Sequence, residues 1–184
     1  MRRIRTILAA VLCLTVAMAL AGCGTQPANG QSDVTGAAGI ANPIEQYDSL
    51  AEAEKAAGFT FTVPEGVNLN GEDYAQYDWS TINRDLIEVR YGAAGDEVCY
   101  MRKAAASGME DISGDYNVYD DVKTEDITLE DGRTATVTLK GKGDVFYLAT
   151  WQLRGATDNG IWDYCIGVQG IPEEDLLQLV RMVE

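Results

Sequence analysis

Apolar and polar residues alternate with a period of two over much of the chain beyond residue 58, a pattern typical of β-strands with one buried face. The alternation is cleanest where Ala135, Val137 and Leu139 are separated by threonines. It is weakest in the segment 73–81, which is rich in aromatic residues. The pattern predicts strands over residues 59–63, 73–81, 85–91, 97–103, 123–129, 133–140, 144–153 and 161–169.

Two segments carry the period of a helix, one at each end of this region. Ser49 and Glu52 form a capping box that begins a short helix over residues 49–57, before Gly58. A second helix begins at Pro172 and carries one apolar stripe at helical spacing. These elements predict an α+β fold: a curved, mostly antiparallel meander of about six to seven strands, with both helices packed on one face.

The connections between the strands carry turn signals. Asp131 and Gly132 predict a two-residue type I′ hairpin. Residues 104–121 are rich in glycine, alanine and aspartate, and they predict an irregular excursion between two strands. The glycines at 141 and 143 lack a phosphate-binding pattern and indicate a turn.

The first 23 residues have the features of an export signal. Three arginines lie among the first five residues, and an apolar run over residues 7–20 follows them. A helix that spans a bilayer needs about 20 apolar residues, so this run favours a secretory signal peptide. The residues Leu-Ala-Gly-Cys that end at Cys23 resemble the lipobox of bacterial lipoproteins. The resemblance implies cleavage before Cys23 and attachment of a diacylglycerol to its thiol, whereas the alternative is an ordinary signal with an incidental cysteine.

The chain thereby divides into a signal peptide at 1–22, a flexible tether at 23–43 and one folded domain at 44–184. The tether is rich in small and polar residues, which bury too little apolar area to fold. A lipid on Cys23 would hold the domain at the outer face of the bacterial cytoplasmic membrane. The membrane is therefore the first predicted partner.

Charge and composition exclude several classes of function. The chain has 14 basic and 29 acidic residues and a net charge of −15, which disfavours binding to nucleic-acid phosphates. It contains no histidine, so Ser-His-Asp and Cys-His catalysis and histidine-containing zinc sites are excluded. No motif predicts a metal or another cofactor.

Several short sequences of the folded domain, taken in order, resemble a known family. They are LAEAEKAAGFTFTVPEGV, IEVRY, FYLATWQ, WDYCIGVQG and PEEDLLQLVRMV. Their order over residues 44–184 is similar to that of the DUF4367 family, domains of unknown function on extracytoplasmic proteins of Gram-positive bacteria. The chain departs from the family where a proline-rich segment would follow the first strand, since only Pro64 remains there. The resemblance implies no catalytic residue.

Two sets of residues in this domain are candidates for disulfide chemistry or ligand binding. Cys99 and Cys165 could form a disulfide if their strands are neighbours, with Cα atoms within about 7 Å. The alternative is two separate buried thiols. Tyr74, Tyr77 and Trp79 could line a groove for a peptide or glycan, or they could pack the sheet.

Acidic residues gather between residues 110 and 131, where Lys123 is the one base. This acidic segment could bind calcium or a basic partner, but its spacing does not match a known calcium loop. A solvated acidic edge that discourages aggregation is the favoured interpretation. The nine acidic residues are Glu110, Asp111, Asp115, Asp120, Asp121, Glu125, Asp126, Glu130 and Asp131.

These observations lead to three hypotheses about function. The first is a non-enzymatic lipoprotein module that binds or senses a component of the cell envelope or an envelope protein. The second is a carrier of a lipid or another hydrophobic ligand. The third is a carboxylate-based hydrolase of envelope glycans, which would require two acids fixed about 5–10 Å apart.

Overall fold

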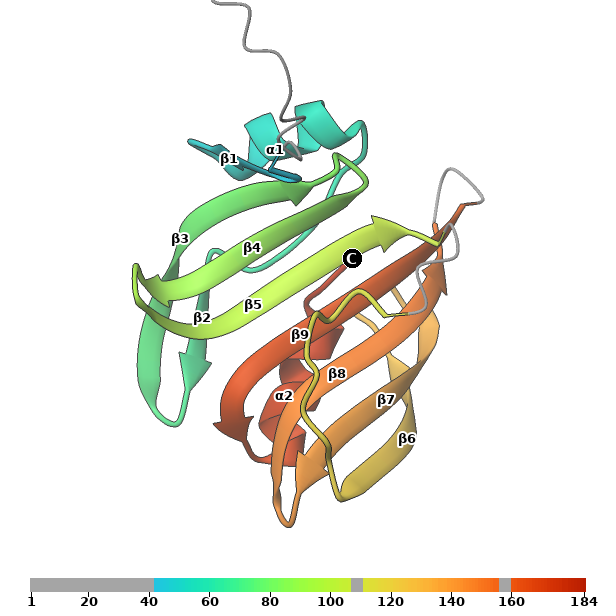
Figure 1. Ribbon diagram of the computed structural model, residues 1–184. Helices are drawn as coiled ribbons and strands as arrows, with labels where there is room; N and C mark the ends of the chain where they lie inside the picture. Colours follow the sequence, from blue (N-terminus) through green and yellow to red (C-terminus); the bar gives the residue numbers. More distant parts are fainter. Residues whose placement is uncertain (1–41, 107–110, 156–159) are drawn as a thin grey trace, which may run out of the picture. The chain divides into compact units, whose positions relative to one another are not determined.

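The computed structural model describes residues 42–106, 111–155 and 160–184 (Figure 1). The predicted signal peptide, the lipidation site Cys23, nearly all of the predicted tether and Glu110 lie outside these residues. No helix in the three described ranges is long and apolar enough to cross a membrane.

The described residues form nine strands and two helices, which confirms the α+β class and the mostly antiparallel sheet. The strands outnumber the six to seven that the sequence predicts. The elements in chain order are β1 (Ile44–Tyr47), α1 (Leu50–Ala57), β2 (Gly66–Leu69), β3 (Glu72–Ile82), β4 (Leu86–Ala93), β5 (Asp96–Ala105), β6 (Asp121–Thr128), β7 (Thr134–Lys142), β8 (Val145–Arg154), β9 (Ile161–Ile171) and α2 (Glu173–Arg181).

The sheet is antiparallel, with the order β1-β3-β4-β5-β9-β8-β7-β6, and β2 pairs with β3. The strand that follows β5 in the chain, β6, does not pair with β5. The chain begins again at the far edge with β6 and returns through β7 and β8, so that β9 pairs with β5. Residues 111–120, which we call the crossing segment, run across one face of the sheet on the way to β6 (Figure 1).

The two faces of the sheet differ in what covers them. On the helix face, Val89 of β4 lies beside Met101 of β5, and this face packs against both helices. Tyr91 and Ile166 are also fully buried there. Among the described residues, the opposite face, which we call the open face, carries a small apolar cluster where the crossing segment packs on the sheet. That cluster consists of Leu86, Ala104, Ile112, Leu148 and Cys165.

Both helices begin where the sequence predicts, and α1 also ends there. The Ser49 side chain accepts a hydrogen bond from the Glu52 backbone N–H at 3.4 Å, and Gly58 ends α1 with a φ of 83°. Ala53 is the buried residue of α1. Helix α2 follows Pro172, and the apolar residues of its predicted stripe are buried: Leu176, Leu179 and Val180 within the helix, and Val183 just beyond its end.

The prediction of a strand over residues 59–63 is wrong. This segment packs Phe61 into the core of the helix face, but it belongs to no strand of the sheet. Thr62 exchanges two backbone hydrogen bonds with Glu184, at 2.7 and 3.0 Å. An extended segment can bury alternate side chains without joining a sheet, so alternation alone does not distinguish the two cases. The strands β1 and β2, four residues each, were not predicted from the sequence, although more and less exposed residues alternate along both.

The predicted type I′ turn is also wrong. The Leu129 N–H donates to the Arg133 carbonyl at 2.8 Å, which leaves a loop of three residues between them. Gly132 has a φ of 83°, whereas Asp131 is not in the left-handed region. Asp131 instead accepts a hydrogen bond from the Arg133 N–H at 2.9 Å. A three-residue loop that ends in a left-handed glycine is the next most common hairpin geometry.

Candidate functional site

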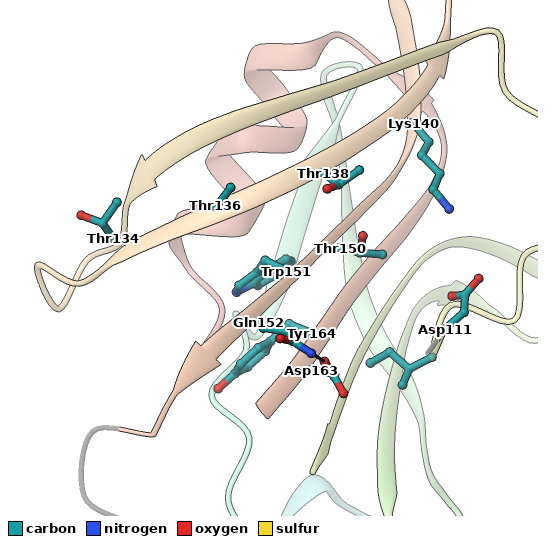
Figure 2. A pocket seen from close by; sticks show the side chains of 11 residues that line it. Asp111, Thr134, Thr136, Thr138, Lys140, Thr150, Trp151, Gln152, Asp163 and Tyr164 are labelled. Carbon is teal, nitrogen blue, oxygen red and sulfur yellow. Dashed lines mark hydrogen bonds between the residues drawn. The ribbon is translucent and has the colours of Figure 1, made fainter. Parts of the chain in front are cut away.

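A polar pocket lies on the open face of β7, β8 and β9 (Figure 2). Its volume is about 550 Å³, and hydroxyl, amide and carboxylate side chains dominate its lining. We call it the threonine groove. It is lined by Asp111, Ile112, Thr134, Thr136, Thr138, Lys140, Thr150, Trp151, Gln152, Asp163 and Tyr164.

The alternation of β7 explains the threonines. Val137 and Leu139 are fully buried on the helix face, which directs Thr136 and Thr138 to the open face. The pairing of β7 with β8 places Thr150 opposite Thr138. Hydroxyl groups from two neighbouring strands therefore lie side by side.

The ninth strand adds an acid to the groove. Asp163 pairs across the sheet with Gln152, and its Oδ1 accepts a hydrogen bond from Gln152 Nε2 at 2.7 Å. Asp163 is 9% exposed, so this bond orients a nearly buried carboxylate. On the other side of the groove, Thr136 Oγ1 donates to Asp126 at 2.7 Å. The groove thus combines hydrogen-bonded, oriented groups with an accessible surface.

The crossing segment forms one wall of the groove and is fastened to the sheet. Arg102 donates from Nη1 to the carbonyl of Ile112 at 2.8 Å and also to the carbonyl of Ser113. The Tyr100 hydroxyl donates to the same Ser113 carbonyl at 3.0 Å. Ile112 itself is buried in the small apolar cluster. Two side chains of β5 therefore set the position of this wall.

A buried carboxylate holds Arg102 in turn. Glu88 is 2% exposed, and it accepts hydrogen bonds from Arg102 Nε at 2.6 Å and from Arg90 Nε at 2.7 Å. Burial alone would lower the pKa of Arg90, but the hydrogen bond to Glu88 together with the charges of Glu88 and Glu97 outweighs it and raises the pKa above its usual value. Arg90 also forms ion pairs with Asp78 and Glu97, at 3.8 and 3.1 Å. This network neutralises Glu88 and supports the crossing segment from below.

A second pocket lies on the other side of the crossing segment. Its volume is about 290 Å³, and we call it the tyrosine pocket. The rings of Tyr119 and Tyr147 meet at 5.8 Å between centroids with an interplanar angle of 32°. Its lining residues are Tyr100, Gly114, Asp115, Asn117, Tyr119, Tyr147, Gly167 and Val168.

Asp115 is the acidic group of the tyrosine pocket. Burial by itself would raise the pKa of Asp115, but hydrogen bonds from the Tyr119 hydroxyl and from Asn117 outweigh it and lower the pKa. Burial and the same contact with Asp115 raise the pKa of Tyr119 to about 12. At neutral pH the pocket therefore holds the Asp115 carboxylate beside the neutral hydroxyl of Tyr119.

The structure does not bring the three predicted groove residues Tyr74, Tyr77 and Trp79 into one groove. Tyr74 lines a third pocket of about 250 Å³, which neither Tyr77 nor Trp79 lines. Trp79 packs against the core of the helix face, and its indole N–H donates to Gln76 at 2.7 Å. An irregularity in the pairing of β3 with β4 between Gln76 and Asp78 breaks the alternation of these aromatic residues.

The structure contains no disulfide between Cys99 and Cys165, and both thiols are free and buried. Their strands are neighbours, as the disulfide prediction requires. However, the register pairs Cys99 with Val168 and Cys165 with Arg102, and it places the thiols on opposite faces of the sheet. Burial raises the pKa of both thiols, that of Cys165 to about 12.

The residues of the acidic segment lie in several places. Asp111 lines the threonine groove, and Asp131 lies in the loop between β6 and β7. Asp115 enters the tyrosine pocket, whereas Asp121, Glu125 and Asp126 lie on β6, an edge strand with mostly exposed residues. The edge position agrees with the interpretation as a solvated acidic edge. Within the residues that the structure describes, no group of three or more acidic, cysteine or histidine side chains is arranged to hold a metal ion.

Sequence reasoning missed both pockets on the open face. The alternating threonines of β7 are a visible signal, but the residues that join them come from β8, β9 and the crossing segment. The tyrosine pocket likewise combines β5, β8, β9 and the crossing segment. No pattern along the chain identifies these combinations.

Comparison with family models, with curated proteins and with solved structures gave no match for this chain. The resemblance to the DUF4367 family therefore rests on the sequence alone and stays a prediction.

Proposed function

We propose that the protein is a binding module of the cell envelope, held at the outer face of the cytoplasmic membrane through Cys23, and that its threonine groove takes a neutral ligand rich in hydroxyl or amide groups. A glycan or a peptide has this chemistry. The observation that carries the proposal is the row of hydroxyl groups along β7 and β8 beside the oriented pair Gln152 and Asp163.

The groove suits such a ligand because each hydroxyl both donates and accepts hydrogen bonds. A ligand with many hydroxyl or amide groups offers partners of both kinds at short spacing. Asp111 and Asp163 line the groove together with Lys140, on a chain of net charge −15. This balance disfavours a polyanionic ligand, since the field of the whole protein would repel it.

The packing of the helix face favours this proposal over a carrier of hydrophobic ligands. Large side chains fill the space between sheet and helices, among them Tyr91, Phe146 and Leu176, each at most 1% exposed. A carrier would need an apolar cavity of a few hundred Å³ in that place. Lipid that co-purifies with the protein and is detected by native mass spectrometry would favour the carrier instead.

The decisive experiment is a titration of the full-length protein with cell-wall disaccharides, with and without their stem peptides, followed by calorimetry. We expect Thr136→Val and Thr138→Val each to weaken binding roughly threefold to tenfold, as the loss of one hydrogen bond would. Thr60→Val is the matched control, because Thr60 is exposed and lies outside the groove. Absence of binding at millimolar concentration, or an equal effect of the control, would overturn the proposal.

A hydrolase is the second candidate, because Asp111 and Asp163 line the same groove. General acid and base chemistry on a glycan needs two such carboxylates. The same disaccharides and longer glycan strands serve as substrates. If the protein hydrolyses these substrates, and Asp163→Asn abolishes hydrolysis but not binding, the protein is a hydrolase and not a binding module.

A further inference from the structure

Two apolar side chains of the crossing segment project into solvent. Tyr116 is 96% exposed and Val118 is 94% exposed. They alternate with Asp115, Asn117 and Tyr119, which line the tyrosine pocket. One side of this short stretch thus contacts the pocket, while the other side presents two apolar groups.

The stretch that carries these groups is anchored. The Ser113 carbonyl is bound by Tyr100 and Arg102, and the Ser113 hydroxyl accepts a hydrogen bond from the Asp115 N–H at 3.1 Å. Tyr119 packs against Tyr147 further along. Single exposed apolar residues are ordinary, but two on a fastened segment beside a pocket are typical of an interaction site.

The chemistry of the tyrosine pocket specifies the charge of a partner. The faces of aromatic rings attract cations, and a carboxylate strengthens that attraction. Asp115 and the rings of Tyr119 and Tyr147 lie together there. Lys140 acts on Asp115 electrostatically, but it lines the threonine groove and not this pocket.

We propose that the crossing segment is a docking surface for a basic protein segment, which places a lysine or arginine side chain in the tyrosine pocket and covers Tyr116 and Val118 with adjacent apolar residues. The proposal goes beyond the threonine groove, since it concerns the other pocket and a macromolecular partner. Along the chain, the crossing segment also carries Asp111 and Asp120, and no basic residue lies within residues 111–120, which suits a basic partner.

The same charges argue against a membrane as the occupant. The acidic leaflet of a bacterial membrane repels a segment with this many carboxylates. The chain as a whole carries a net charge of −15, so the repulsion is not local.

The experiment measures the binding of fluorescein-labelled peptides to the full-length protein by anisotropy. The probes are eight-residue peptides that alternate lysine or arginine with valine, leucine or tyrosine, and counterparts with glutamate in place of the bases. We expect the basic peptides to bind and the acidic ones not to bind. Affinity should fall as salt rises, because screening weakens exposed charge pairs.

The variants test each half of the surface. We expect Tyr116→Ser with Val118→Ser to weaken binding at least tenfold, and Asp115→Asn at least fivefold. Ile44→Ser is the apolar control, since Ile44 is 44% exposed on β1, and Asp85→Asn is the charge control on an exposed turn. Both controls should stay within twofold. The thermal unfolding of each variant confirms that it is folded.

Each other outcome counts against the docking surface. Failure of every basic peptide to bind at millimolar concentration overturns it, as does equal binding of the acidic peptides. If the protein binds phosphatidylglycerol vesicles and Tyr116→Ser abolishes that binding, the surface is a membrane-binding site instead. Thr136→Val should leave the binding of the basic peptides unchanged. The experiment therefore tests the docking surface independently of the ligand proposed for the threonine groove.

Discussion

The ring of Tyr100 on β5 lies directly on the backbone of Gly167 on β9. The two residues pair across the sheet, and a Cβ atom at Gly167 would lie 2.2 Å from Tyr100 Cε1. Because position 167 has no side chain, the ring can lie flat and direct its hydroxyl to the Ser113 carbonyl. The pair thereby fastens the crossing segment, which separates the two pockets of the open face.

We predict that Gly167→Ala destabilises the protein by about 1–3 kcal/mol, the usual cost of overpacking a buried site. The added methyl group would push Tyr100 off the sheet and loosen the segment around Ser113. The measurement is urea unfolding of a double-mutant cycle. In a Tyr100→Ala background the same change should cost little, and equal costs in both backgrounds would show that the two residues do not interact.

Glu88→Gln should destabilise the protein by about 3–5 kcal/mol, as the loss of one partner from a buried ion pair does. The substitution leaves Arg90 and Arg102 without their shared carboxylate. Thermal unfolding measures the effect. The control is Glu45→Gln, which disrupts an exposed pair with Arg84 and should hardly move the unfolding midpoint. Equal shifts in the two variants would contradict this account.

The pH dependence of stability should reveal Asp115. Its pKa is lowered below the ordinary value of 3.8 in the folded protein. The stability that this carboxylate contributes is therefore present above that pH and is lost as the pH falls through the folded pKa. Thermal unfolding midpoints measured between pH 7 and pH 2 test this. The unfolding midpoint of the wild type should exceed that of Asp115→Asn at neutral pH, and the difference should disappear in acid. A difference that does not change with pH would contradict a lowered pKa for Asp115.

Both thiols of the folded domain should be present as free cysteines, and both should resist alkylation in the native state. Cys99 and Cys165 are each at most 1% exposed, and burial raises their pKa values. The test is iodoacetamide labelling before and after unfolding without a reductant, followed by mass spectrometry of the two peptides. Full labelling of both after unfolding is expected. If the unfolded cysteines react with iodoacetamide only after a reductant is added, they form a disulfide.

Cys23→Ala should abolish attachment of the protein to the membrane, because the lipid would have no thiol to modify. The measurement is fractionation of expressing cells, with the mass of the mature N-terminal peptide as the second readout. In the wild type we expect a peptide that begins at Cys23 and carries two acyl chains. Cys13→Ala is the control, and it should leave the location unchanged. A wild-type protein that is released without lipid would refute the anchor.

The local features of the fold could be predicted because their physical causes are local. A capping serine with a glycine at the other end defines α1, and one apolar stripe defines the buried side of α2. The alternating strand predicted over residues 85–91 is β4, in which Ile87, Val89 and Tyr91 are buried in the core of the helix face. The extended segment that holds Phe61 and the strand β1 escape this reasoning, since their partners are Glu184 and the far end of β3. Strand β2 pairs with the adjacent β3 across Asn70 and Gly71, both with positive φ, so it had a local turn signal that sequence reasoning missed.

The candidate site could be predicted only in part. The threonines of β7 are evident as the polar side of an amphipathic strand, but Asp163 joins them through the pairing of β8 with β9. Tyr74 and Trp79 are evident as aromatic residues, yet an irregularity in β3 and the packing of Trp79 separate them. A site made from several strands depends on register, which a single strand does not encode.

The sequence by itself determined the α+β class, both helices and the buried side of regularly alternating strands such as β7, since these follow from periodicity and caps within a few residues. The tertiary structure decided the strand order and the register. It placed β9 beside β5, set Cys99 and Cys165 on opposite faces, and laid the crossing segment over the open face. The physical reason is that pairing between distant segments is chosen by the combined burial of all of them. Residues as far apart as Tyr100 and Gly167 become neighbours only when the whole sheet has formed.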